Sequence, residues 1–461
     1  MAAKAFYDRV ESDALSAMRR PGRLYWVSLG LAAACFAGGM GLWLYQILNG
    51  MGVAGIRHPV GWGVYITNFV FWVGIAHSGT LISAVLFLFR ARFRSSFNRS
   101  AEAMTVIAVM TAGLFPLIHL GRSWFFYWLL PYPNQRLLWV NFRSPLIWDV
   151  FAVSTYFTVS LIFFYVGTIP DLAGLRGKVA GVRRWIYRVL SLGWTGTPRQ
   201  WNHYGQLYLF LAALATPLVI SVHSIVSWDF AMSIVPGWHT TIFAPYFVAG
   251  AIFSGTAMVM TLAIPMRRIL HLEAYITRDH FESIAKILLF TSLIVTYAYI
   301  VEFALAFYSG HVAEIQHFTY RATGDYRVLF GIMILCNVLL PLTLFVRRLR
   351  RSLGYLFALS LLVNVGMWVE RFVIIVSALA KEYEPYSWGI YTPRPIEIGI
   401  TIGSFGMFFT LFLLFTKALP VLSLTEVKER GPEPAAGTAA ELPAAAQAPP
   451  ITARAPEMER E

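Results

Sequence analysis

Ten apolar runs, each long enough to cross a membrane, constrain this chain more than any other feature of its sequence. A helix of about 20 residues spans a hydrocarbon layer of about 30 Å and satisfies its own backbone hydrogen bonds. The short alternating pattern of a membrane barrel is absent. The chain is therefore predicted to be an all-α polytopic membrane protein with ten transmembrane helices. The runs occupy residues 24–46, 62–89, 101–130, 146–169, 204–228, 241–266, 282–307, 326–346, 353–379 and 396–416.

Composition agrees with this fold class. The chain is 57% hydrophobic and only 13% charged, and its formal net charge is +13. The basic residues stand in short clusters between the apolar runs, which is typical of cytoplasmic loops and not of a nucleic-acid interface. We therefore expect a lipid environment and no nucleic-acid partner.

The distribution of Lys and Arg predicts the orientation of the helices. The loops at 90–100, 170–203, 267–281 and 347–352 together hold 17 of these residues. The alternating loops hold 6, and they lie at 47–61, 131–145, 229–240, 308–325 and 380–395. Because positively charged loops stay on the cytoplasmic side, both termini are predicted to be cytoplasmic.

An internal repeat relates the second helix to the sixth. Gly61-Trp62 is followed by Ser78-Gly79-Thr80, and Gly237-Trp238 is followed by Ser254-Gly255-Thr256 at the same spacing. Both helices are predicted to run inward, so the repeat is parallel, with its axis along the membrane normal. Helices 2–5 and 6–9 are predicted to form two four-helix bundles, flanked by helices 1 and 10.

This organisation divides the chain into six expected segments. They are a cytoplasmic lead-in (1–23), the first helix with its outer loop (24–61), the first bundle (62–228), the second bundle (229–379), the tenth helix (380–418) and a Pro- and Ala-rich cytoplasmic tail (419–461).

Four polar residues are expected at the same outer depth of the first bundle. His119 lies in the outer half of the third helix, and Asp149 lies in the first turn of the fourth. The fifth helix ends near Asp229, with His223 about two turns below it. Charged and polar groups are costly in lipid and usually mark function. Alone, each aspartate is more often a helix cap or an interfacial polar residue, and His223 is equally explained as a hydrogen-bonding partner of a neighbouring helix.

Histidine and carboxylate groups in an apolar setting suit the oxidation of a quinol. They can accept hydrogen bonds from its two hydroxyls and take up the two protons as two electrons leave. Trp148 would form an apolar wall for the ring, and Arg122 could steady a carboxylate. His119, Asp149 and Asp229 are thus candidate catalytic residues, with Arg122, Trp148 and His223 as candidate quinol-binding residues.

Further polar groups in the apolar runs are candidates for a proton path. Paired structural ions or interhelical hydrogen bonds explain them equally well. These residues are His77, Tyr297, Tyr299, Glu302, Glu370 and Arg371.

Other redox sites find little support in the sequence. Cys35 and Cys336, the two cysteines, cannot build an iron-sulfur cluster or a covalent haem site, and no metal-ligand motif is present. His119 with His223 could still hold one haem between them. A secondary transporter and a structural anchor with a vestigial site are the alternatives from other functional classes.

The residues at 58–80, 101–122, 144–157 and 223–256 resemble the NrfD/polysulfide-reductase family of quinone-reactive membrane subunits. Within that family the resemblance is nearest to the quinol-binding membrane subunits of bacterial alternative complex III. It implies ten helices in two bundles and quinol oxidation at the outer face. It also implies that the family's site histidine falls on His119.

The resemblance further implies a setting for the chain. Menaquinol or a related quinol would be the bound substrate, and electrons would pass to a periplasmic iron-sulfur or molybdoenzyme-like subunit. Multihaem cytochrome c subunits, a second NrfD-like membrane subunit and, often, a terminal oxidase would be the other partners in a bacterial cytoplasmic membrane. An alternative within the family is the quinone-reactive anchor of a polysulfide reductase-type molybdoenzyme.

Overall fold

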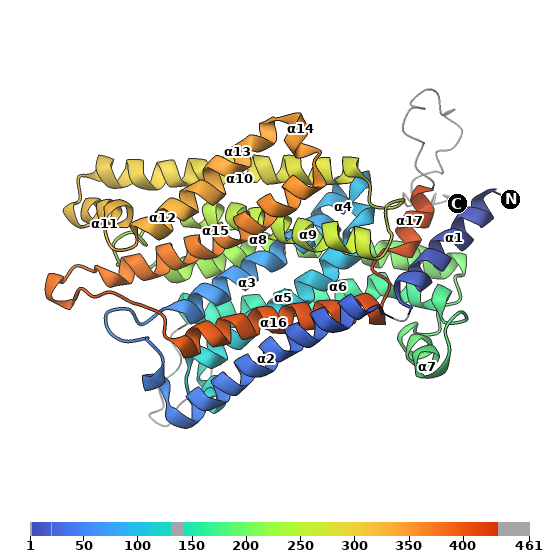
Figure 1. Cartoon of the computed structure of the whole chain (residues 1–461), viewed down its shortest axis with the longest axis horizontal. Helices are drawn as coiled ribbons and strands as arrows, with labels where there is room; N and C mark the ends of the chain where they lie inside the picture. Colours follow the sequence, from blue (N-terminus) through green and yellow to red (C-terminus); the bar gives the residue numbers. More distant parts are fainter. Residues whose placement is uncertain (1, 20, 131–141, 432–461) are drawn as a thin grey trace, which may run out of the picture.

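The computed structural model describes residues 2–19, 21–130 and 142–431. Within these ranges ten helices are long and apolar enough to cross a membrane, which confirms the predicted fold class. The described part of the chain contains no β-strand, and the long helices follow the long axis of the molecule (Figure 1). The spans are α2 (Arg23–Asn49), α3 with its continuation α4 (Val64–Leu88), α5 (Asn98–His119), α6 (Pro145–Leu175), α8 (Pro198–Ala231), α9 (Phe243–Ile269), α10 (Arg278–Ser309), α12 with its continuation (Arg327–Phe345), α15 (Leu353–Ala380) and α16 (Pro395–Ala418).

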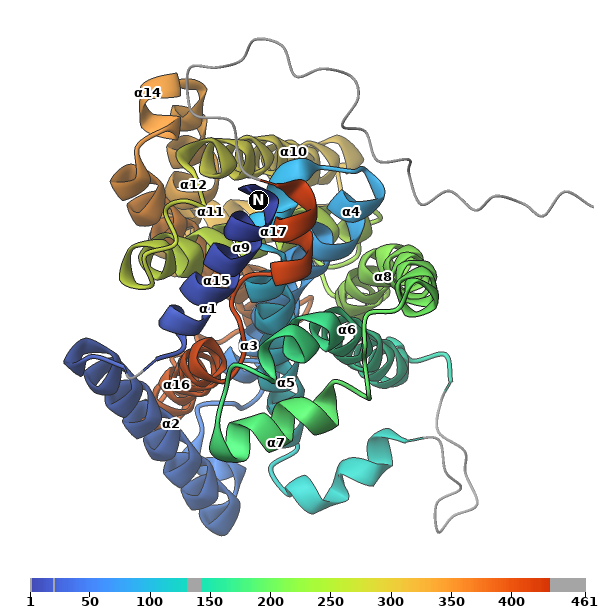
Figure 2. The same cartoon turned by 90° about the vertical axis from the view of Figure 1, so that its right-hand side faces the viewer.

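The spans pack in two groups with a pair outside them (Figure 2). In the first group α3 packs on α5, α5 on α6, α6 on α8 and α8 on the π-helical turn that continues α3. In the second group α9 packs on α10 and α15, and α12 packs on α15. The pair α2 and α16 lies against α3 and α5. The two predicted bundles, the duplication and the side of the membrane that holds the termini stay predictions, because α3 and α8 also pack on α9.

The two halves of the sequence repeat meet each other at the centre of the molecule. The rings of Trp62 and Trp238 lie 5.7 Å apart, although they open different helices. Further along the same interface α3 and α9 approach closely, because a Cβ atom at Gly255 would lie 2.7 Å from the Ile75 carbonyl oxygen. Contacts between equivalent residues are what a two-fold pseudo-axis between α3 and α9 requires.

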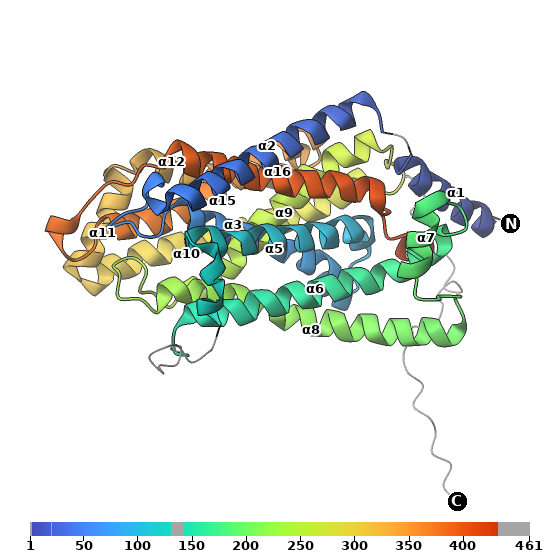
Figure 3. The same cartoon turned by 90° about the horizontal axis from the view of Figure 1, so that it is seen from below.

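The starts of α6 and α8 mark opposite ends of the first group. Proline is the first residue of α6, where its missing N–H costs no hydrogen bond. Thr197 caps α8 and accepts a hydrogen bond from the backbone N–H of Gln200. Seen from below, α6 and α8 run side by side for most of their length (Figure 3). The start of α6 therefore meets the end of α8.

Three connections differ from the expected boundaries. The third apolar run is expected to be helical over 101–130, but α5 ends at His119 and Gly121 turns the chain with a φ of +71°. The aromatic residues beyond it form a separate 3₁₀ helix, Ser123–Leu129. The expected outer loop at 308–325 contains α11 (Val312–Thr323), and the inner loop at 170–203 contains α7 (Gly181–Leu190). Hydropathy alone does not signal these turns, because the residues on both sides of each are apolar or mixed.

The two ends of the described chain lie together. Helix α1 (Ala2–Ala17) packs on α17 (Leu424–Arg430), next to the labelled N-terminus in Figure 1. The Glu11 carboxylate accepts hydrogen bonds from Lys178 and Lys428. Burial opposes ionisation of Glu11, but these two ammonium groups hold its pKa below the ordinary value. The expected cytoplasmic tail thus begins with an ordered helix, and most of its Pro- and Ala-rich part lies outside the described residues.

Candidate functional site

A pair of carboxyl groups stands where α6 begins and α8 ends. Asp149 is the fifth residue of α6, and Asp229 is the third residue from the end of α8. Their carboxyl groups lie within hydrogen-bonding reach of each other, and two carboxylates can pair directly only when they share a proton, because each ionised group can only accept. One oxygen of each group, Oδ1, is buried and has no hydrogen-bond partner among the described residues. The pair therefore has unused acceptors within an apolar setting.

Tryptophan rings stand beside this pair. The rings of Trp148 and Trp228 meet edge to face with centroids 6.0 Å apart, each adjacent in sequence to one of the aspartates. Nε1 of Trp148 donates a hydrogen bond to the Phe142 carbonyl oxygen at 2.6 Å, which fixes the ring. Trp228 is not among the site residues predicted from the sequence. Its position directly before Asp229 could have identified it.

His119 lies at the end of the neighbouring helix α5, and Arg122 follows it after a turn. His119 is the last residue of α5, and its Nδ1 atom is buried without a hydrogen-bond partner in the described chain. Helix α5 packs on α6, and the aromatic 3₁₀ helix that follows contacts both. The described residues show no contact between His119 and either aspartate, and Arg122 is exposed beyond the Gly121 turn. A ligand would have to bridge the histidine and the carboxyl pair.

Deeper in the first group two histidines touch. The rings of His77 on α3 and His223 on α8 lie 4.5 Å apart, and both are buried. Nδ1 of His77 donates to the Val73 carbonyl oxygen at 2.7 Å, whereas neither nitrogen of His223 has a hydrogen-bond partner among the described residues. The ring of His223 on α8 therefore contacts that of His77 on α3.

In the second group most of the proposed proton-path residues form one network. Tyr299 donates to Glu370, and Asn337 donates to both Tyr299 and Glu370 at 3.1 Å. Glu370 also accepts a hydrogen bond from Arg371 at 2.7 Å. Tyr297 stands apart from this network, since 63% of its surface is exposed on α10.

Glu302 belongs to a different cluster, one that the sequence does not suggest. Its Oε2 atom lies 3.6 Å from Nη1 of Arg321, and Nη2 of Arg321 donates to Nε2 of His317 at 3.2 Å. Arg321 and His317 are on α11 and are buried. Burial and the nearby Arg321 guanidinium lower the pKa of His317 well below its ordinary value. The predicted boundaries leave Arg321 in a loop, because nothing in the sequence shows that α11 folds back onto α10.

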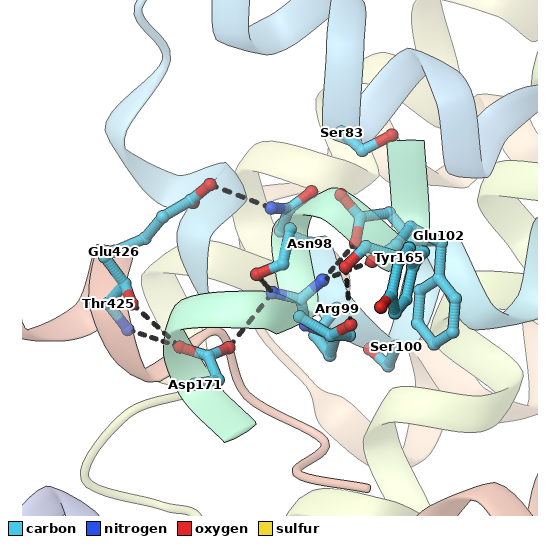
Figure 4. A network of polar contacts seen from close by, with 12 residues as sticks. Ser83, Asn98, Arg99, Ser100, Glu102, Tyr165, Asp171, Thr425 and Glu426 are labelled. Carbon is cyan, nitrogen blue, oxygen red and sulfur yellow. Dashed lines mark hydrogen bonds and ion pairs between the residues drawn. The ribbon is translucent and has the colours of Figure 1, made fainter. Parts of the chain in front are cut away.

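A second buried ion cluster lies at the opposite end of the first group (Figure 4). Arg99 donates to Glu102 at 2.7 Å and to Asp171 at 3.0 Å, and only 1% of its side chain is exposed. Thr425 of α17 donates to Asp171 at 2.8 Å, and Glu426 accepts from Asn98 at 2.9 Å. The i, i+3 spacing of Arg99 and Glu102 is a signal for this pair, but the predicted boundaries leave Arg99 in a loop. The cluster ties the ordered start of the tail to α5 and α6.

The described residues hold no group of three or more His, Cys, Asp and Glu side chains placed to bind a metal.

The family profile described as polysulphide reductase, NrfD matches residues 52–381, well over half of the chain. The chain belongs to the NrfD family. The match includes both helix groups and every residue proposed for the site.

Curated relatives span similar lengths. The chain is 27% identical over 400 residues to a putative dimethyl sulfoxide reductase membrane subunit of Halobacterium salinarum, covering 81% of this chain and 86% of the relative. It is 22% identical over 429 residues to a selenate reductase subunit of Mesobacillus selenatarsenatis, covering 87% and 95%. A third relative, an Hdr-like menaquinol oxidoreductase integral membrane subunit of Archaeoglobus fulgidus, is 20% identical over 55% of this chain and 52% of its own length.

Proposed function

We propose that this NrfD-family chain is the quinol-oxidising membrane subunit of a respiratory electron-transfer complex. The observation that carries the proposal is the close pair of carboxyl groups of Asp149 and Asp229, with a buried, unpartnered oxygen on each and the contact between Trp148 and Trp228 next to them in sequence. A quinol is an apolar ring with two hydroxyl donors, and this site offers apolar walls with carboxyl acceptors. The menaquinol oxidoreductase named among the relatives supports the substrate class.

Oxidation of a quinol to a quinone releases two electrons and two protons. In the proposal the quinol bridges His119 and the carboxyl pair, so that Nδ1 or Nε2 of His119 accepts one hydroxyl proton and the pair accepts the other. Trp148 packs against the ring, and Arg122, which is exposed next to the Gly121 turn, stabilises the carboxyl pair when it is ionised. The electrons leave to an iron-sulfur cluster in a partner protein, since the chain's own cysteines cannot build one.

We propose that protons leave or enter along the other buried polar residues. His223 lies six residues below Asp229 on α8, about 9 Å along the helix, and it touches His77. In the second group Tyr299, Glu370 and Arg371 form a connected network, while Glu302 stands nearer the end of α10. Release of protons on the outer side would contribute to the transmembrane gradient.

The finer assignment is the quinol-binding membrane component of a bacterial alternative complex III in the cytoplasmic membrane. Its partners would be a periplasmic iron-sulfur, molybdoenzyme-like subunit, multihaem cytochrome c subunits, a second NrfD-like membrane subunit and a terminal oxidase. Two relatives carry names of reductase subunits, which favours a second candidate, the quinol-oxidising anchor of a molybdoenzyme reductase. Purification of the native complex distinguishes the two, because the first contains c-type haem and the second contains a molybdenum cofactor.

The site is tested by quinol-dependent electron transfer in the assembled complex. We expect Asp149→Asn, Asp229→Asn and His119→Ala to lower turnover by about 100-fold or more, as for the loss of a general acid-base group. Asp279→Asn is the matched control, because Asp279 is an exposed aspartate at the opposite end of the long helix α10. Normal turnover in an assembled complex carrying Asp149→Asn and Asp229→Asn together would reject the proposed site.

A further inference from the structure

A cavity lies beside Trp228. It has a volume of about 730 Å³, within the usual range for small-molecule sites. Helices α8 and α10 both pack on α9, and the cavity opens between their ends and α11. Trp228 lines it and also meets the ring of Trp148 edge to face. The cavity is therefore adjacent to the carboxyl pair but formed mainly by the second half of the chain.

An unpartnered carboxylate oxygen lies in this cavity. Glu302 lines it, only 3% of the residue is exposed, and its Oε1 atom has no hydrogen-bond partner in the described chain. Its other oxygen, Oε2, lies 3.6 Å from Nη1 of Arg321, so Oε1 is the atom left without a partner among the described residues. A buried acceptor without a donor costs about 1–3 kcal/mol, so a ligand hydroxyl at this place would recover that cost.

A second acceptor stands at the mouth of the cavity. Nδ1 of His239 lies 3.0 Å from the Ser233 carbonyl oxygen, which can only accept. Nδ1 of the neutral ring therefore carries the hydrogen, and Nε2 is left as an acceptor. Glu302 lies seven residues, about 10 Å, from the end of α10, so this acceptor and the carboxylate stand at different depths. Between them the lining is largely apolar and includes Leu305, Ala306 and Phe318.

We infer that this cavity is a second binding site, selective for the reduced, quinol form of a quinone-headed lipid. A quinol can donate a hydroxyl hydrogen to the buried Glu302 oxygen, whereas the oxidised quinone carries only acceptors and would leave that oxygen unpaired. The inference rests on the proposed function for the identity of the ligand. The consequence is a store of quinol that Trp228 separates from the carboxyl pair. This second site does not bind the oxidised product.

The site is tested in the purified native complex with a photoreactive quinol analogue, mapped by mass spectrometry and used in reduced and oxidised forms. We expect the reduced probe to label residues 305–309 of α10 in addition to the start of α6, and the oxidised probe to label 305–309 about tenfold less. Glu302→Gln places an amide donor in the cavity, and we expect it to lower labelling by the reduced probe about tenfold. Glu282→Gln is the matched control, the same change at the opposite end of α10.

A second variant distinguishes loss of the binding site from misfolding. Ala244→Trp fills the cavity from α9 without touching the pair of Glu302 and Arg321, and we expect the same loss of label at 305–309. Absence of label at 305–309, or label that is equal for both redox forms and unchanged in both variants, would overturn the inference and leave a water-filled cavity. Label at 305–309 without label at the start of α6 would instead reject the proposed function and keep the second site.

Discussion

Several buried polar atoms without a hydrogen-bond partner belong to residues on which the proposed chemistry depends. They include Oδ1 of Asp149 and Asp229, Oε1 of Glu302 and both ring nitrogens of His223. Each such atom costs about 1–3 kcal/mol of stability when no water or ligand reaches it. A chain that needed only to fold would do better with apolar side chains at these positions, so their presence favours a ligand or a proton path.

His223 allows this trade of stability for activity to be measured. We expect His223→Leu to leave the unfolding temperature unchanged or higher, because two unpartnered nitrogens are removed while one ring contact with His77 is lost. Quinol turnover should fall about tenfold if the ring carries protons. The control is His203→Leu on the same helix, where the histidine is exposed. A lower unfolding temperature together with normal turnover would show that His223 is structural.

His317 gives the protein a pH-dependent stability. Its folded-state pKa is lowered by burial and by Arg321, so the folded protein binds fewer protons than the unfolded chain below the ordinary histidine pKa of about 6.5. Stability from this group is complete above that pH and is lost as the pH falls toward the lowered folded value, by up to about 1.4 kcal/mol per pH unit.

We expect His317→Gln to flatten the fall in unfolding temperature between pH 7 and pH 5, since glutamine can still accept the hydrogen bond from Arg321. Thermal unfolding at several pH values measures the effect. His311→Gln serves as the control, because His311 is exposed just before α11. Equal slopes in the His317 variant and the unchanged protein would contradict this prediction.

At the scale of elements, α7 differs from every spanning helix. It is a short amphipathic helix at the same end of the molecule as α1 and α17 (Figure 1). Its exposed apolar residues lie on one side and two arginines, Arg184 and Arg188, on the other. This pattern is typical of a helix that lies in the membrane interface. The exposed apolar residues are Val182, Trp185, Ile186 and Val189.

We expect a polarity-sensitive fluorophore on a cysteine at Trp185 to report an apolar environment in lipid vesicles, and one at Arg188 to report water. The measurement uses a background in which Cys35 and Cys336 are alanine. Solvent-like emission at both positions would show that α7 is held above the membrane or covered by a partner.

The sequence predicted the spanning elements well, because their signal is long and repeated, and it predicted less about the connections. Counting along the helices placed Asp149 and Asp229 at one depth, and their side chains meet. Counting residues along the predicted helices could not place Arg321 or Arg99 inside the protein. Arg321 is buried because the loop helix α11 folds back onto α10, and Arg99 is buried because α5 starts earlier than predicted. Averages over a window of apolar residues carry no information on such turns.

At the scale of the whole molecule, the contact between α3 and α9 joins the two helix groups. Gly255 lies at that contact, where an added Cβ would overlap the Ser78 side chain and lie 2.7 Å from the Ile75 carbonyl oxygen. A backbone oxygen cannot move aside without shifting α3, so we expect Gly255→Ala to destabilise the protein by about 1–3 kcal/mol. Gly113→Ala is the matched control, because Gly113 is within α5 and nothing lies within 4 Å of its added Cβ.

The control should gain about 0.5–1 kcal/mol, since alanine favours a helix more than glycine does. Thermal unfolding of the purified complex measures both variants, and opposite shifts are expected. If the two helix groups were held together mainly by α2 and α16, or by partner proteins, the Gly255 variant would unfold at the same temperature as the unchanged protein. A loss confined to Gly255→Ala would instead identify the interface between the repeated segments as the contact on which assembly of the two groups depends.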